Sequence, residues 1–171
     1  ISTSLGLATH DYTLWPMFAQ IWILFLGSFV ACSGSTGGGI KMMRAMILYK
    51  QVIREIVRSL HPNAVRPVRM GRNPVPEHIL HAVLGFSFMY MVSIVSLTLV
   101  LSAAGLELVT AFSAVVACLN NTGPGLGLVG PASNYQGLDD LHKWVLCFAM
   151  ILGRLEIFTF LVVLTPTFWR R

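Results

Sequence analysis

The sequence predicts an all-α integral membrane fold made of repeats in which an outer helix, a pore loop and an inner helix follow one another. Composition indicates the membrane, because 55% of the 171 residues are hydrophobic and only 11% are charged, well outside the usual range of soluble domains. Segment length indicates the helices, since a hydrocarbon core about 30 Å thick takes about 20 apolar residues to cross. Residues 78–104 and 141–169 reach that length, and residues 16–31 only approach it before glycines interrupt them.

Basic residues indicate which side of the membrane the segments face. Eight of the twelve lysines and arginines lie between residues 41 and 72, where Glu55 alone opposes them. The positive-inside rule explains this concentration as a cytoplasmic connection between membrane segments, and it does so better than a nucleic-acid surface would. We therefore expect no nucleic-acid partner, a cytoplasmic connector over 61–77, and an outward direction for 78–104.

The C-terminal part, residues 78–171, has the order of one complete repeat. Its outer helix is expected over 78–104. Residues 107–120 are apolar but too short to span the membrane, so we expect them to form a re-entrant pore helix. A filter loop over 121–127 and an inner helix over 141–169, which returns to the inside, complete the unit.

A weak internal repeat places the second half of another unit in residues 1–60. Leu24–Gly27, with the sequence Leu-Phe-Leu-Gly, aligns with Met150–Gly153, Met-Ile-Leu-Gly. Internal similarity at a fixed offset is a signature of repeated architecture. We therefore expect a filter strand over 1–8 and a broken inner helix over 15–60.

A glycine loop stands before each expected inner helix, around Gly6 in the first unit and Gly123 in the second. Non-helical backbone at membrane depth is tolerated only where it is buried in protein or lines an aqueous path. Glycine reaches positive φ at little cost, and rings of carbonyl oxygens can replace the hydration shell of a potassium ion. The two loops predict a potassium-channel-like pore; the alternative is a pair of ordinary glycine turns.

The run Cys32–Gly39 interrupts the first expected inner helix with glycine and serine. An interior glycine costs about 1 kcal/mol relative to alanine in a helix, so the helix should break here, unless the run is only a flexible helix end. A phosphate-binding loop is excluded, because Gly39 is followed by Ile40-Lys41-Met42 rather than by Lys-Ser/Thr, and no strand precedes the run.

Arg154 lies 13 residues into the last expected helix, about 20 Å from its start. A membrane-buried arginine is costly and normally faces a cavity or a partner. Glu156 does not simply neutralise it, since helix residues two apart do not face each other. The alternative is a structural arginine that binds carbonyls at a helix break. Asp11, Asp139 and Asp140 fall near the expected outer mouth, where they would attract cations.

Other classes of protein fit the sequence less well. An intramembrane serine protease using Ser33 or Ser35 would need a base within reach, but all five histidines fall at expected membrane edges or in loops. A purely structural subunit would not carry non-helical backbone at membrane depth twice. The three cysteines show no metal or disulfide spacing, so we expect them to be small buried hydrophobes. The chain is expected not to be an enzyme.

Three stretches of the chain resemble signatures of the Trk/Ktr/HKT superfamily of potassium transporters. They are Leu-Asn-Asn-Thr-Gly-Pro-Gly at 119–125, Ala-Cys-Ser-Gly-Ser-Thr-Gly-Gly-Gly-Ile-Lys at 31–41, and the ending Gly-Arg-Leu-Glu-Ile-Phe at 153–158 with Thr-Pro-Thr-Phe-Trp at 165–169. In that superfamily four repeats in one polypeptide surround a single pore, and two subunits form a dimer. The chain is similar to the second half of the third repeat and all of the fourth.

The resemblance implies roles for particular residues. It places Ser4, Leu5 and Gly6 on the third filter strand and Asn121, Thr122 and Gly123 on the fourth, with potassium at the filter as the only metal. It implies a gating loop beneath the filter, made of Gly34, Ser35, Thr36, Gly37, Gly38 and Gly39. It also implies that Arg154 is a cation beside the pore. Gly125 supplies a second filter glycine in the fourth strand, whereas the third has Ala8, a departure that implies fewer well-formed ion sites.

The implied function is potassium uptake across the bacterial inner membrane by a multi-pass protein, with potassium as the transported ion and no bound cofactor. The alternative is a less selective monovalent cation (K⁺/Na⁺) transporter or an ion-coupled symporter of the same superfamily. The implied partners are upstream repeats of the same polypeptide, a second copy in a homodimer, membrane lipid, and a cytosolic nucleotide-binding ring like TrkA. That ring would dock on the basic residues 41–72 and on Arg170 and Arg171.

Overall fold

The computed structural model describes residues 6–8, 10–29, 38–61, 67–71 and 73–155. These residues are mostly helical, as expected. The five α-helices are α1 Met17–Phe29, α2 Met42–Leu60, α3 Glu77–Ala103, α4 Leu108–Leu119 and α5 Asp140–Arg154, and three short 3-10 helices are η1 Tyr12–Leu14, η2 Gly127–Val129 and η3 Tyr135–Gly137. Residues 1–5, 9, 30–37, 62–66, 72 and 156–171 lie outside this description.

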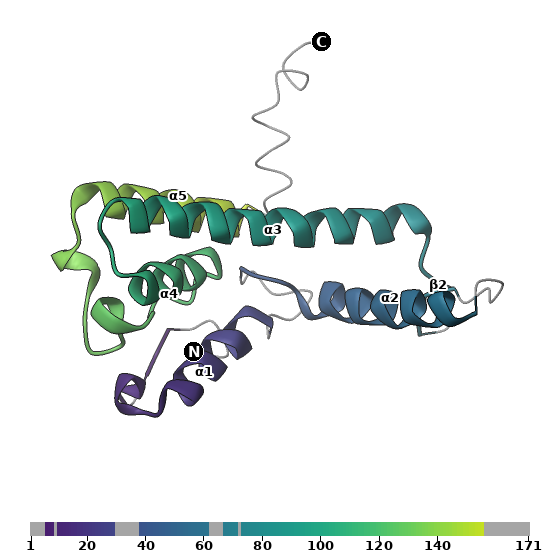
Figure 1. Ribbon diagram of the computed structural model, residues 1–171, viewed down its shortest axis with the longest axis horizontal. Coiled ribbons are helices and arrows are strands. Elements are labelled where there is room, and N and C mark those ends of the chain that lie inside the picture. Colours follow the sequence, from purple (N-terminus) through teal and green to yellow (C-terminus); the bar gives the residue numbers. More distant parts are fainter. Residues whose placement is uncertain (1–5, 9, 30–37, 62–66, 72, 156–171) are drawn as a thin grey trace, which may run out of the picture.

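Helix α3 is the long element of the fold (Figure 1). Its 27 residues extend about 40 Å at 1.5 Å per residue. It is the one helix among the described residues that is long and apolar enough to cross a membrane, by length and composition. Large apolar side chains such as Phe88 and Leu99 are 69% and 61% exposed. An apolar surface of this kind requires a cover, either lipid or protein.

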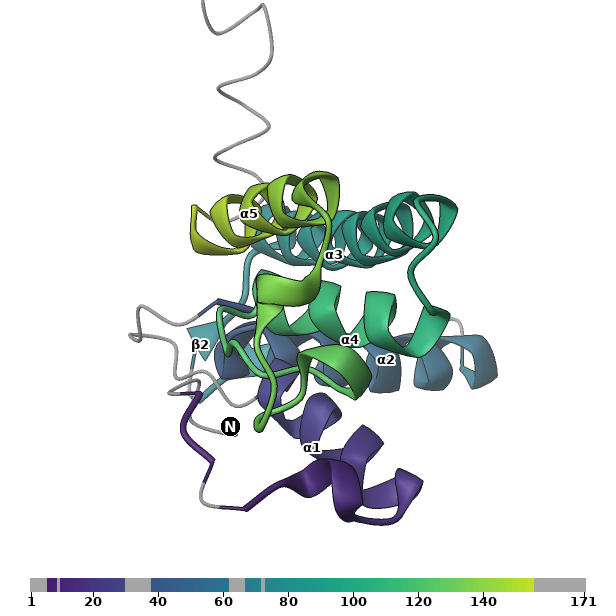
Figure 2. The same cartoon turned by 90° about the vertical axis from the view of Figure 1, so that its left-hand side faces the viewer.

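Helix α4 forms the core of the fold. It lies beneath α3 and α5, which run side by side (Figures 1 and 2). Nine of its twelve residues are buried, among them Ala114 and Val115, which pack with Leu101 of α3 and Leu146 of α5. A helix that is buried almost all round cannot be an amphipathic surface helix. The C-terminal end of α4 is therefore held in a fixed position by the two longer helices.

Helix α2 packs along the N-terminal half of α3 (Figure 1). Ile47 of α2 meets Leu80 and Val83 of α3 in a small apolar cluster. An ion pair of 3.6 Å joins Arg54 Nη2 to Glu77 Oε1 near the start of α3. Apolar packing and this ion pair thus connect the basic helix α2 to the start of α3.

The expected connector contains a short hairpin that the sequence did not reveal. Strand β1, Arg69–Met70, pairs antiparallel with β2, Asn73–Pro74. Gly71 at the turn has a φ of +62°, a conformation that suits glycine. Two-residue strands that contain a proline have no alternating apolar pattern, so the sequence offered only a loop.

The bounds of the helices can be compared with the expected segments. Helix α3 occupies the segment expected as the outer helix, α4 occupies the segment expected as the pore helix, and the non-helical residues Gly38–Lys41 separate α1 from α2. Helix α5 is shorter than the expected inner helix over 141–169, because it ends at Arg154, directly after a glycine, which has low helix propensity. The rest of that segment lies outside the described residues.

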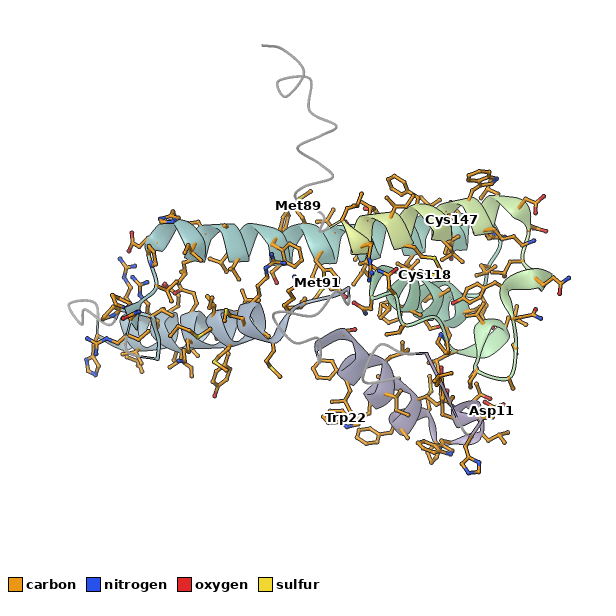
Figure 3. The ribbon with its side chains drawn as sticks, turned by 180° about the vertical axis from the view of Figure 1, so that it is seen from behind. Asp11, Trp22, Met89, Met91, Cys118 and Cys147 are labelled. Carbon is orange, nitrogen blue, oxygen red and sulfur yellow. The ribbon has the colours of Figure 1, made fainter. Side chains whose placement is uncertain are left out.

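The expectation of buried cysteines holds for only one of the two that the structure describes. Cys118 of α4 is buried and Cys147 of α5 is exposed in this chain, and Figure 3 labels both. Expecting Cys147 to be buried was wrong, because this position is not among the buried ones of α5, which are His142, Leu146, Ala149 and Leu152. Cys32 lies outside the described residues.

Candidate functional site

The site is built on the loop that follows α4. The helix ends at Leu119, and Asn121 then takes a left-handed φ of 55° while Gly123 takes a φ of +93°. Pro124 next in line has no backbone N–H and cannot continue a helix. The backbone therefore leaves the helix abruptly, as the glycine-punctuated sequence predicts.

Hydrogen bonds fold this loop back onto α4. The backbone N–H of Thr122 donates to the carbonyl oxygen of Ala117 at 2.9 Å, and the Thr122 hydroxyl donates to the same oxygen at 3.1 Å. The backbone N–H of Leu126 donates to the Ser113 hydroxyl at 2.9 Å. The first two bonds satisfy the carbonyl oxygen of Ala117 near the helix end, and the third fixes the far end of the loop.

Two tyrosines hold carbonyl groups of the same loop. The Tyr135 hydroxyl donates to the carbonyl oxygen of Gly123 at 2.6 Å. The Tyr12 hydroxyl donates to the carbonyl oxygen of Gly125 at 2.8 Å, although the two residues are 113 positions apart. Side chains from two other parts of the chain thus hold two carbonyl groups of one short stretch.

The loop around Gly6 lies directly against this loop. A Cβ added to Gly6 would stand 2.5 Å from the carbonyl oxygen of Thr122 and 3.5 Å from Cδ of Pro124, and the φ of Gly6 is +72°. The two glycine loops, far apart in the sequence, are therefore side by side with backbone facing backbone. Ser4 and Leu5, the other expected residues of the first loop, lie outside the described residues.

The end of the glycine run lies against the C-terminal end of α4 and the first residues of its loop. A Cβ added to Gly38 would stand 2.8 Å from the carbonyl oxygen of Leu119 and 2.9 Å from the side-chain nitrogen of Asn121. Gly39, with a φ of +85°, lies against the side-chain oxygen of Asn120. Only glycine fits at both positions. The other expected gating residues, Gly34, Ser35, Thr36 and Gly37, lie outside the described residues.

Asn120 joins this region to two further helices. Its side chain is 1% exposed. Its oxygen accepts a hydrogen bond from the Tyr90 hydroxyl of α3 at 2.8 Å, and its nitrogen donates to the Ser28 hydroxyl of α1 at 3.0 Å. The backbone N–H of Ile40, next to the glycine run, donates to the carbonyl oxygen of Ser28 at 3.2 Å. Buried polar networks of this kind hold their elements in one arrangement when every member is satisfied.

Arg154 lies close to the C-terminal end of α4, where the loop begins. The preceding residue, Gly153, packs so closely on the end of α4 that an added Cβ would overlap the carbonyl oxygen of Leu119. Arg154 is the last residue of α5 and is exposed. The structure therefore places this arginine one residue from the contact between α5 and the start of the loop.

Acidic side chains gather at the opposite end of α5 from Arg154. Figure 3 shows Asp11 at the end of the molecule where the connection between α4 and α5 also lies. Hydrogen bonds from the Thr13 hydroxyl and backbone N–H hold the pKa of Asp11 below its usual range, so this carboxylate stays charged. Asp139 and Asp140 are exposed at the start of α5, where Asp140 pairs with Lys143 at 3.3 Å.

A metal site made of side chains is not found in the described part of the chain, where no three His, Cys, Asp or Glu side chains form a group that could hold an ion. His81 contacts the carbonyl oxygen of Glu77 at 2.8 Å and is exposed. An ion at this site would instead be held by backbone oxygens, which suit hard cations.

Sequence reasoning missed the polar residues that hold the loop, namely Tyr12, Tyr90, Asn120 and Tyr135. A signal for Tyr90 and Asn120 was present, because polar side chains within apolar segments are rare and usually have partners. No signal identified the partners themselves.

Comparisons with known proteins agree over nearly the whole chain. The family model TrkH, described as a cation transport protein, matches residues 1–170. The chain is 44% identical over 170 residues to the Trk system potassium uptake protein TrkH of Escherichia coli (strain K12), which covers 99% of this chain and 35% of that protein. It is 41% identical over 168 residues to the potassium uptake protein TrkG of the same organism, covering 98% and 34%. The chain spans about a third of the length of the curated relatives it matches.

A solved structure shows the same fold. The crystal structure of the potassium transporter TrkH from Vibrio parahaemolyticus matches with a TM-score of 0.90 at 44% sequence identity, covering 99% of this chain and 36% of that one. The curated relatives are named as transport proteins rather than as enzymes. The arrangement of α1 to α5 is therefore one that a known transporter contains.

Proposed function

This chain belongs to the TrkH family of cation transport proteins, in keeping with the resemblance of its motifs, and from that premise we propose that it forms part of a potassium uptake pore in the bacterial inner membrane. The loops around Gly6 and Asn121–Gly123 are two neighbouring strands of its selectivity filter. Their carbonyl oxygens replace the hydration shell of potassium. Ser4 and Leu5 belong to the first of these strands by the same resemblance.

The observation that carries this proposal is the contact between Gly6 and the carbonyl group of Thr122. Two ordinary helix-to-helix turns have no reason to meet backbone to backbone. Neighbouring strands of a filter must meet in this way, because side chains at the contact would separate the rings of oxygen atoms. The carbonyl groups of Asn121 and Thr122 supply the oxygens that such a ring needs.

We place the gate at the glycine run Gly34–Gly39. Its described end lies against Leu119–Asn121, where the loop begins, so a displacement of the run would change the space next to the filter. Glycine has no side chain that could collide with a neighbour, so the glycines of this run allow such a movement at low steric cost. Arg154, close to the contact of α5 with Leu119, supplies positive charge that opposes cations when the run is closed.

Assembly around the pore requires more protein than this chain. Because the chain spans about a third of its relatives, we propose that upstream repeats of the same polypeptide complete the filter and cover part of the apolar surface of α3. Lipid and a second copy, in a homodimer, would cover the rest. The basic helix α2 offers a surface to a cytosolic nucleotide-binding ring like TrkA.

A second candidate function rests on Ala8. Gly6 has no second glycine two positions on, whereas Gly123 is followed by Gly125. A filter with fewer matching strands forms fewer well-shaped ion sites, which favours a less selective K⁺/Na⁺ pathway or an ion-coupled symporter of the same superfamily.

The test is rubidium uptake, as a tracer for potassium, in a bacterium that lacks its own potassium uptake systems and expresses the full-length protein. Gly123→Ser is expected to change the potassium-to-sodium preference, because serine is strained at a φ of +93°. Arg154→Ala is expected to raise the flux, because it removes a cation from the closed path. Gly105→Ser is the matched control, since Gly105 has a φ of +97° in an open turn between α3 and α4.

Two results would contradict the proposal. One is an absence of rubidium uptake by the wild-type protein when it is present in the membrane in normal amount. The other is a Gly123→Ser protein that folds and retains the wild-type preference, which would leave residues 121–125 as a turn. A weak preference in the wild type, with uptake intact, would favour the second candidate.

A further inference from the structure

The glycine loop at 120–126 needs support from outside itself. Glycine allows the φ of +93° at Gly123, but the same freedom lets its peptide group turn in either direction. A filter distinguishes ions by the position of its oxygen atoms, so groups outside the filter strand must hold its carbonyl groups in position. The hydrogen bonds to Ala117 and Ser113 fix the ends of the loop and leave its middle to other groups.

Two phenolic hydroxyls reach that middle from different parts of the fold. Tyr135 belongs to η3, downstream of the loop, and its hydroxyl lies 2.6 Å from the carbonyl oxygen of Gly123. Tyr12 belongs to η1, in the preceding unit, and its hydroxyl lies 2.8 Å from the carbonyl oxygen of Gly125. The carbonyl groups that the two tyrosines hold belong to Gly123 and Gly125, and glycine is the most flexible residue type of the backbone.

We propose that Tyr12 and Tyr135 are positioning residues, which hold the glycine carbonyls of the loop and thereby set the preference for potassium over sodium. This inference rests on the proposed filter function and adds residues that the filter motif does not contain. A carbonyl oxygen has two lone pairs, so the hydrogen bond from a tyrosine leaves one lone pair of Gly123 for an ion.

The surroundings suit both tyrosines to this role. Tyr12 is 4% exposed, and Tyr135 is half-buried and packs on the core cluster beside α4. Burial raises the pKa of Tyr12 to about 12, with a smaller contribution from Asp11, and burial likewise raises the pKa of Tyr135. Both hydroxyls therefore keep their proton and remain donors at every physiological pH.

The two tyrosines also differ in origin. Tyr135 lies in the same repeat as the loop, whereas Tyr12 comes from the preceding unit and crosses to it. The Tyr12 bond therefore fixes the fourth filter strand relative to the third, in addition to fixing one carbonyl. Loss of either hydroxyl should loosen the loop without removing any apolar contact of the ring.

The experiment uses the full-length protein with Tyr12→Phe, Tyr135→Phe, the double variant, and Tyr49→Phe as control. Each substitution removes one oxygen atom and keeps the ring. Tyr49 lies on α2 with 67% of its surface exposed, so its variant reports the general effect of the change. The measurement is the ratio of rubidium to sodium uptake, with the amount of folded protein and its melting temperature in detergent measured in parallel.

We expect each filter variant to lower the rubidium-to-sodium ratio about five-fold, the factor that corresponds to one neutral hydrogen bond, and Tyr49→Phe to leave it unchanged. Selective uptake by the wild type with an unchanged ratio in both Tyr12→Phe and Tyr135→Phe would overturn this inference and leave the proposed function intact. A fall in protein amount with no change in ratio would also overturn it, because that result describes a purely structural role. An absence of rubidium uptake by the wild type would overturn the proposed function as well.

Discussion

Substitution of Gly6 by alanine tests the contact between Gly6 and the carbonyl group of Thr122, once the effect of backbone strain alone is known from a control. A non-glycine residue in the left-handed region costs about 1–2 kcal/mol, and Gly6, with a φ of +72°, would incur this cost. Its Cβ would also stand 2.5 Å from the carbonyl oxygen of Thr122, where ordinary contacts begin at 3.4 Å, so the two groups must separate by about 0.9 Å. Overpacking of this kind costs a further 1–3 kcal/mol or so.

Gly105→Ala is the matched control for this substitution. Gly105 has a φ of +97° and no atom within 4 Å of an added Cβ, so it carries the strain without the collision. We expect Gly6→Ala to lower the free energy of unfolding by about 2–5 kcal/mol in total. Gly105→Ala should lower it only by the backbone strain of about 1–2 kcal/mol.

The assay is uptake of rubidium and sodium by the full-length protein, together with its melting temperature in detergent. A shift of the Thr122 carbonyl group by about an ångström should change the ion preference of Gly6→Ala, while Gly105→Ala should keep the preference of the wild type. Equal ion preference and equal melting temperature in the two variants would contradict a functional contact between Gly6 and Thr122, because the crowded position would then behave like the open turn at Gly105.

Two further predictions concern the polar groups around the loop. Asn120→Ala should lower the melting temperature by more than Tyr90→Phe does, because it removes both hydrogen bonds of the buried amide, each worth about 0.5–1.5 kcal/mol, whereas Tyr90→Phe removes one. Thermal unfolding in detergent measures this, and equal shifts would contradict the network. The ion preference should stay constant from about pH 6 to pH 9 in uptake assays, because a raised phenol pKa keeps Tyr12 protonated below the ordinary value of 10.0 and its donor is lost only as the pH rises toward about 12. A preference for potassium that changes between about pH 6 and pH 9 would show that a group other than Tyr12 controls it.

Segment lengths were predictable from the sequence because length and apolarity decide them. The run that became α3 exceeds the thickness of a bilayer, and the run that became α4 falls short of it, so both segments stood out without any knowledge of their neighbours. The position of the loop was predictable as well, since Gly123 and Pro124 end a helix by local chemistry.

The contacts that hold the loop were not predictable, because they depend on packing between distant segments. Tyr12 is 113 residues from the carbonyl group of Gly125, and Ser28 is 92 residues from Asn120. Neither tyrosine of the loop belongs to the motif that identified it. The hairpin at Arg69–Pro74 was missed for the opposite reason, since its strands are too short to show a period.

The most direct test of the account is to locate the ion. Crystals of the full-length protein grown with rubidium in place of potassium can be measured at the rubidium absorption edge. If the two loops are filter strands, an anomalous peak should lie within coordination distance of the Thr122 carbonyl oxygen, beside the loop of Gly6. Density that is absent there, with rubidium bound elsewhere along the path, would contradict the claim that these two loops are strands of a filter.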